Sequence, residues 1–162
     1  MGKDENDLAK LKKDYNKIQL EFNLPSFEEL NKDFYIEKIA ETETDFLVRE
    51  VRRFIADRLS NYMRLVETML NPVNVQMFVF SVIKLIGVSE KKKLSEIYQR
   101  LAKKEIEILK LDIEFSEQKE ADFIKESFQM WQEIKKEMLG FLEVIERNWD
   151  NKDPVNGKGY FN

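Results

Sequence analysis

The stretch MFVFSVIKLIG, residues 77–87, decides the fold, because it is the most apolar run in a chain that is otherwise rich in Lys and Glu. The run from Val75 to Ile86 spans 12 residues, whereas a helix needs about 20 to cross a bilayer, and Lys84 interrupts it. We therefore predict a helix over 74–86 that is buried on nearly all sides and ends at Gly87. A β-strand is the alternative, since the run is rich in β-branched and aromatic residues. The only other clear alternation is LKLDIEF at 109–115, however, and two strands among long helices would form a weak sheet.

Composition favours the helical interpretation for the whole chain. With 5 Gly and 3 Pro in 162 residues, the sequence has little turn material for a many-stranded fold, and 36% of its residues are charged. This balance is typical of long amphipathic helices around one core. We therefore predict an all-α fold, an irregular bundle of four or five long helices with an N-terminal helical arm.

Periodicity and capping residues place the helices. The arm covers residues 1–23 and carries a narrow apolar stripe, which predicts either packing on the body of the molecule or a coiled coil with another chain. Ser26 and Glu29 form a capping box before a short helix, Thr42 and Asp45 repeat that spacing before a helix over 44–70, and Ser116 precedes the last helix. The bundle domain covers residues 24–150, with its later helices over 89–111 and 117–149. A flexible tail is predicted for 151–162. Trp131 and Trp149 share one face of the last helix and are predicted to lie in the core.

The residue inventory argues against several kinds of chemistry. The chain has no Cys and no His, so it lacks the commonest general base, the thiolate nucleophile and the zinc ligands. The glycines cluster only after residue 156, which argues against a phosphate-binding loop. We therefore predict no catalytic residue, no cofactor and no metal site. A carboxylate-based magnesium enzyme is the remaining enzymatic alternative.

One helix carries an unusual local charge. Residues 46–64 contain five Arg against Glu50 and Asp57, in a chain whose net charge is −4. At about 100° per residue, four of these arginines share roughly a third of the helix circumference. The pattern is that of a solvated face whose charges pair with Glu-rich neighbours, and the same residues are the candidate patch for docking an acidic protein partner or RNA: Arg49, Arg52, Arg53 and Arg64.

Two charges interrupt predicted apolar faces. Arg58 falls among apolar residues of the 44–70 helix, and Glu105 falls among those of the 89–111 helix. We predict that they form a buried ion pair that fixes the register of the two helices. Asp112 is the substitute partner, and the alternative is that Arg58 reaches solvent past the helix edge.

These features favour a non-catalytic interaction or adaptor protein with a protein partner and without a membrane. The absence of an apolar signal region favours a cytoplasmic location. An RNA- or ribosome-associated factor that binds through the arginine face is the alternative function. The sequence does not indicate an oligomeric state.

Overall fold

The computed structural model describes residues 2–151, and the secondary structure in this range is entirely helical. The all-α prediction is therefore confirmed. The elements in chain order are α1 (Gly2–Phe22), α2 (Phe27–Phe34), the 3₁₀ helix η1 (Ile36–Glu41), α3 (Leu47–Leu70), α4 (Met77–Ile83), α5 (Val88–Ile113) and α6 (Glu117–Asp150). Apart from Asn151, the predicted flexible tail lies outside the described residues.

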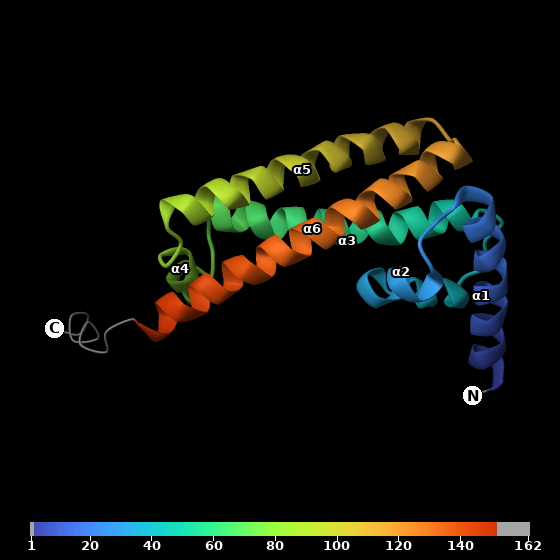
Figure 1. Ribbon diagram of the computed structural model, residues 1–162, viewed down its shortest axis with the longest axis horizontal. Coiled ribbons are helices and arrows are strands. Elements are labelled where there is room, and N and C mark those ends of the chain that lie inside the picture. Colours follow the sequence, from blue (N-terminus) through green and yellow to red (C-terminus); the bar gives the residue numbers. More distant parts are fainter. Residues whose placement is uncertain (1, 152–162) are drawn as a thin grey trace.

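Three long helices form the body of the molecule. α3, α5 and α6 lie side by side along its long axis, and α2 runs beside α3 (Figure 1). α1 stands across one end of this body, whereas α4 lies at the other end, between the start of α5 and the end of α6 (Figure 1). Across residues 2–151, none of the helices combines the length and the apolar character of a bilayer-spanning segment.

Local hydrogen bonds explain where several helices begin. Ser26 Oγ accepts from the backbone N–H of Glu29 at 3.2 Å, and Glu29 Oε2 accepts from the backbone N–H of Ser26 at 2.8 Å, which confirms the capping box before α2. Ser116 Oγ caps α6, as predicted. The predicted cap of α3 is wrong, because the Thr42 hydroxyl donates to the Ile39 carbonyl and Thr44 Oγ1 accepts from the backbone of Phe46.

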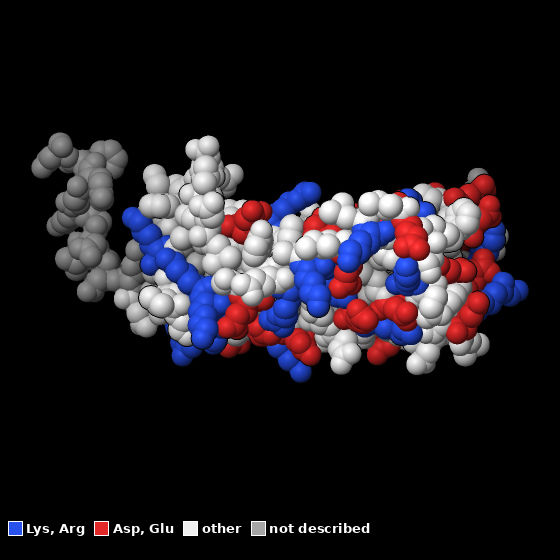
Figure 2. Space-filling view, turned by 90° about the horizontal axis from the view of Figure 1, so that it is seen from above, with Lys and Arg blue, Asp and Glu red and all other residues white. Residues whose placement is uncertain are grey.

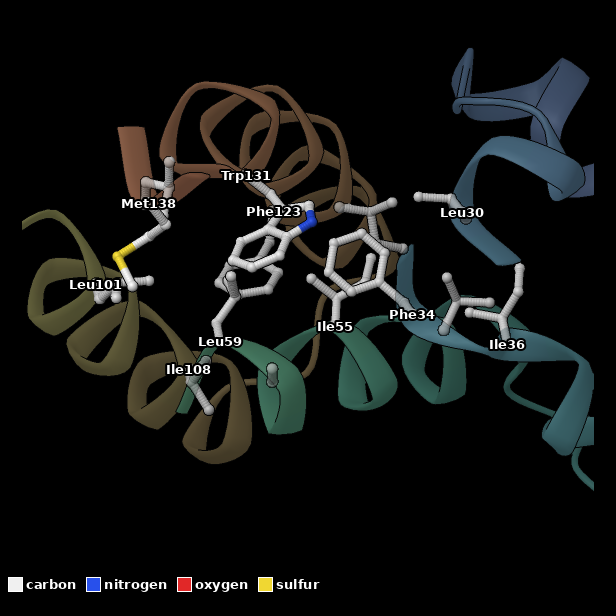
Figure 3. Packing of buried hydrophobic residues seen from close by; sticks show 14 of the residues in the cluster. Leu30, Phe34, Ile36, Ile55, Leu59, Leu101, Ile108, Phe123, Trp131 and Met138 are labelled. Atoms are coloured by element: carbon white, nitrogen blue, oxygen red, sulfur yellow. The ribbon is translucent and has the colours of Figure 1, made fainter. Parts of the chain in front are cut away.

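The core lies where α3, α5 and α6 meet the segment of α2 and η1 (Figure 3). Trp131 of α6 is buried there, as predicted, with its ring centroid 4.5 Å from that of Tyr62 and 6.3 Å from that of Phe34. The same core holds apolar side chains from α2, η1, α3, α5 and α6, among them Leu30, Ile36, Ile55, Leu59, Leu101, Ile108 and Met138. One core therefore connects segments from both halves of the chain.

α1 uses its apolar stripe within the chain. Tyr15 is fully buried, meets the Phe27 ring edge-on at 5.6 Å, and donates from its hydroxyl to the Pro25 carbonyl at 2.6 Å. Leu11 is also buried, and Leu8, Ile18 and Phe22 are partly buried against the same core. The stripe thus packs on the body of the molecule, which is the first of the two arrangements predicted for the arm.

The predicted burial of residues 77–86 is wrong. The segment is helical, but α4 is shorter than predicted, and only Ile83 and Ile86 are buried, whereas Met77 is 82% and Phe78 67% exposed. The physical reason is the place of α4 in the fold. The three long helices bury one another, and α4 packs on the end of this body with only one of its faces. Trp149, in the last turn of α6 beside α4, is likewise 42% exposed, which corrects its predicted place in the core.

Candidate functional site

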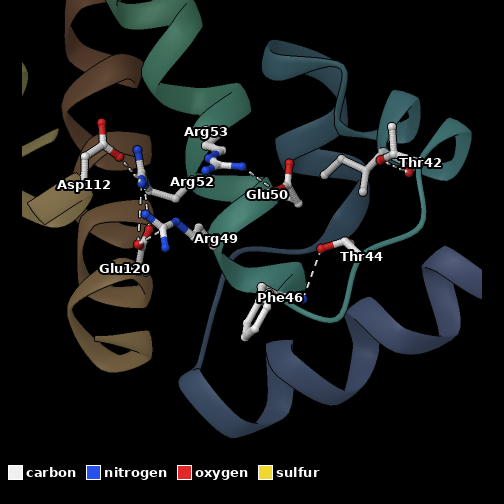
Figure 4. A network of polar contacts seen from close by, with 10 residues as sticks. Thr42, Thr44, Phe46, Arg49, Glu50, Arg52, Arg53, Asp112 and Glu120 are labelled. Atoms are coloured by element: carbon white, nitrogen blue, oxygen red, sulfur yellow. Dashed lines mark hydrogen bonds and ion pairs between the residues drawn. The ribbon is translucent and has the colours of Figure 1, made fainter. Parts of the chain in front are cut away.

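Arg52 lies at the centre of a buried charge cluster that joins three helices (Figure 4). Its Nε donates to Glu120 Oε2 at 2.6 Å, and its Nη2 donates to Asp112 Oδ1 at 2.7 Å. Arg52 is 1% and Glu120 0% exposed. Arg49 Nε lies 3.8 Å from the second Glu120 oxygen. The cluster therefore ties α3 to α5 and to the first turn of α6.

This cluster is structural in its chemistry. Burial by itself lowers the pKa of the Arg52 guanidinium, but the hydrogen bonds to Glu120 and Asp112 outweigh burial and hold that pKa above its usual value. A permanently charged, fully paired guanidinium is neither a general acid nor a free anion receptor. The prediction that Arg52 belongs to an exposed docking patch is therefore wrong.

The other arginines of the predicted patch share a groove with carboxylates. All four line one open groove of about 710 Å³ between α3 and α5, together with Asp57, Glu105 and Asp112. Arg53 is exposed but donates to Glu50 at 2.8 Å. Arg64 is exposed, and within residues 2–151 no ion pair engages it. The structure thus brings the four arginines to one groove, but carboxylates of the same chain pair with most of them.

Arg58 and Glu105 do not form the predicted ion pair. Arg58 lies over the rings of Tyr35 and Tyr62, with its Cζ 5.4 Å from each centroid. Glu105 accepts from the Ser60 hydroxyl at 2.7 Å instead, and Asp112, the substitute partner, binds Arg52. Arg52 does join α3 to α5 through Asp112, whose side chain is half-exposed, but the fully buried contact joins Arg52 to Glu120 of α6.

The prediction for Arg58 is wrong because it treats every apolar residue of α3 as part of the buried face. Residues Phe54, Tyr62 and Leu65 pull the predicted apolar centre toward Arg58, yet Leu65 is 44% exposed. The buried face of α3 is instead made of Val48, Val51, Ile55, Ala56, Leu59 and Val66, and Arg52 lies among them. One sequence signal pointed to its partner, because Glu120 precedes Phe123 and Ile124 at the spacing of the buried α6 face.

A second hollow, of about 430 Å³, lies between α5 and α6 and is lined in part by Leu111, Ile113 and Phe123. Its carboxylates pair with lysines of the chain. Lys104 Nζ lies 2.7 Å from Glu107 and 2.8 Å from Glu126. Two further ion pairs form on the rim, Lys119 with Glu114 and Lys125 with Asp122.

The end of the molecule at α4 exposes a group of large apolar side chains. We call it the α4 end and define it by six residues: Val73, Met77, Phe78, Phe80, Val88 and Trp149. Phe78 contacts Trp149, with ring centroids 6.0 Å apart, which joins α4 to the last turn of α6. Figure 2, which views the molecule from the α5 side, shows an area of uncharged residues at the α4 end with blue residues beside it.

Charged residues border the α4 end. Lys84 Nζ lies 4.6 Å from the centroid of the Phe80 ring, and three more exposed lysines follow in the first turns of α5: Lys91, Lys92 and Lys93. On the last turns of α6, exposed acidic residues lie near Trp149: Glu143, Glu146 and Asp150. Sequence reasoning missed this surface because it assumed that the most apolar run must be the most buried.

No family model matches the chain, and neither a curated protein nor a solved structure matches it at a significant level. The α4 end and the arginine groove therefore stand as candidates on their own geometry.

Proposed function

We propose that this chain is a non-catalytic interaction or adaptor protein that binds a protein partner through the α4 end. The observation that carries the proposal is the exposure of large apolar side chains, with Val88 88% and Met77 82% in solvent. Surfaces of this kind mark interaction sites in soluble proteins, and Met and aromatic residues are enriched at interfaces. The proposal includes the cytoplasmic location expected from the sequence.

Packing supports the same assignment. α4 touches the body of the molecule with one side, through Ile83 and partly buried Val79 and Val82. Its other side leaves Met77, Phe78 and Phe80 in water, at a free energy cost of about 25 cal/mol for each Å² of apolar surface. A partner that covers these side chains removes this cost, which favours docking at the α4 end.

The test compares proteins that copurify with the full chain and with two double variants. We expect Met77→Ser with Phe78→Ser to lose its bound protein. A matched control, Ile106→Ser with Leu109→Ser, removes two exposed apolar side chains from α5 and should retain the partner. An unchanged set of bound proteins in the α4 variant, with its helical content intact, would contradict the proposal.

RNA binding through the arginine face is the weaker alternative. Arg52 is buried, Arg53 pairs with Glu50, and three carboxylates line the same groove. The groove therefore offers little net attraction to phosphates. RNA binding that weakens steeply with salt, and that is lost in Arg53→Gln with Arg64→Gln, would restore this alternative.

A further inference from the structure

The α4 end has two oppositely charged edges. The lysine edge comprises Lys84, Lys91, Lys92 and Lys93, and the acidic edge comprises Glu143, Glu146 and Asp150, with Arg147 in the same stretch. All these side chains are exposed. Among residues 2–151 no ion pair neutralises either edge, in contrast to the paired charges in the hollow between α5 and α6.

The two edges lie on different sides of the apolar surface. α4 sits between the start of α5, which carries the lysines, and the end of α6, which carries the acidic residues (Figure 1). Two contacts fix the end of α6 beside α4. The rings of Phe78 and Trp149 meet, and Asn148 Nδ2 donates to the Leu85 carbonyl at 3.1 Å. The helix ends whose sequences carry the lysines and the acidic residues therefore flank α4.

We infer that the α4 end pairs with the α4 end of a second copy of this chain in a two-fold symmetric dimer. The inference rests on the proposed function, that this end is a docking surface, and names its partner. A two-fold axis through the apolar centre sets the lysine edge of each copy against the acidic edge of the other. The same axis brings Met77, Phe78 and Phe80 of the two copies together, away from water.

An anionic membrane or RNA is a poorer match for the same surface. A uniformly negative partner would attract the lysine edge but would also meet Glu143, Glu146 and Asp150. A surface that carries both signs on either side of an apolar centre is complementary to itself, and like charges placed opposite each other would disfavour other orientations.

The size of the surface predicts a reversible dimer. A stable interface uses about 20–30 residues on each side, whereas the α4 end and its edges comprise fewer. We therefore expect an equilibrium between monomer and dimer that shifts with protein concentration and weakens at high salt, since the charged edges are exposed.

Charge reversal tests the pairing directly. One variant combines Lys91→Glu, Lys92→Glu and Lys93→Glu, so that both edges are acidic, and a second combines Glu146→Lys with Asp150→Lys, so that both edges are basic. Sedimentation of the full chain should show each variant alone dimerising at least about tenfold more weakly than the unmodified chain. An equimolar mixture of the two should recover a dimer, because their edges are complementary. A control with Lys103→Glu and Lys110→Glu, on exposed positions of α5, should dimerise like the unmodified chain.

Several outcomes would overturn the inference. One is a monomer at every concentration, and another is a mixture of the two variants that stays monomeric while the unmodified chain dimerises. Binding of the monomer to vesicles of anionic lipid, lost in the lysine variant, would assign the surface to a membrane instead. If the chain stays monomeric but Met77→Ser with Phe78→Ser loses a different bound protein, the docking function stands and only the self-pairing fails.

Discussion

At the scale of single residues, the most buried charges of this protein pair with one another between helices. Arg52 is the clearest case, because the hydrogen bonds to Glu120 and Asp112 compensate its burial. Arg49 stacks over Phe115 and approaches the same Glu120. Two arginines of α3, Arg49 and Arg52, therefore help to hold this helix against α5 and α6.

We predict that Arg52→Met destabilises the fold by about 3–5 kcal/mol, because Glu120 is left buried without its partner. The free energy of unfolding from urea titration measures this. Arg52→Met combined with Glu120→Leu should recover much of the loss, since no isolated charge remains. Arg53→Met, whose pair with Glu50 is exposed, should change stability by about 0–1 kcal/mol. Equal effects at positions 52 and 53 would show that the cluster is not buried.

A second residue-scale prediction concerns the cap of α2. The backbone N–H of Ser26, followed by its hydroxyl, donates to Glu29 and holds the pKa of that carboxyl below its usual value. A lowered folded-state pKa means that the stabilisation is present above the unfolded pKa of about 4.3 and is lost as the pH falls through the folded value. The free energies of unfolding of the native chain and of Glu29→Gln should therefore differ at pH 7 and become equal in acid. A difference that stays constant down to pH 2 would contradict the ionised cap.

At the scale of elements, α1 is held by one aromatic anchor. Burial, followed by the charges of Glu29 and Glu28, raises the pKa of the Tyr15 hydroxyl, which therefore stays protonated and able to donate to the Pro25 carbonyl. Because Tyr15 also fills the space against Phe27, the arm depends on both its ring and its hydroxyl.

We predict that Tyr15→Ala costs about 3–5 kcal/mol, as expected for removal of a buried aromatic side chain. Tyr15→Phe keeps the ring and should cost about 1 kcal/mol for the lost hydrogen bond. Thermal or urea unfolding measures both values. Leu20→Ala, at a position of the same helix that is exposed to solvent, serves as the control and should have little effect. A free energy of unfolding that Tyr15→Ala leaves unchanged would mean that α1 does not pack on the body of the molecule in solution.

At the scale of the whole molecule, large apolar side chains are exposed in more than one region, at the α4 end and also at Phe46, Ile113 and Phe115. The end at α1 is closed by α1, α2 and η1, whereas the end at α4 is covered by one short helix (Figure 1). The most apolar run of the chain lies at this second end, and much of it is in solvent.

We predict that the backbone amides of 77–86 exchange with solvent faster than those of the buried turns of α3, around Val51–Leu59. Short helices with few buried contacts open locally at low free energy cost. Hydrogen exchange followed by mass spectrometry on dilute protein makes the comparison. Equally slow exchange in both segments would contradict the exposed position of α4. A slowing that depends on protein concentration would agree with docking between two copies.

The sequence by itself determined the helical class, most helix boundaries, the capping box at Ser26 and the burial of Trp131, because each depends on local period or on hydrogen bonds a few residues apart. The pair that the sequence predicted between the helices now labelled α3 and α5, Arg58 with Glu105, does not form. Only the tertiary structure decided that the buried arginine is Arg52, because the rotation of α3 depends on where α5, α6 and η1 press on it at the same time. Only the tertiary structure decided that 77–86 is exposed, because burial depends on how many neighbours surround a segment, and an apolar pattern does not place those neighbours.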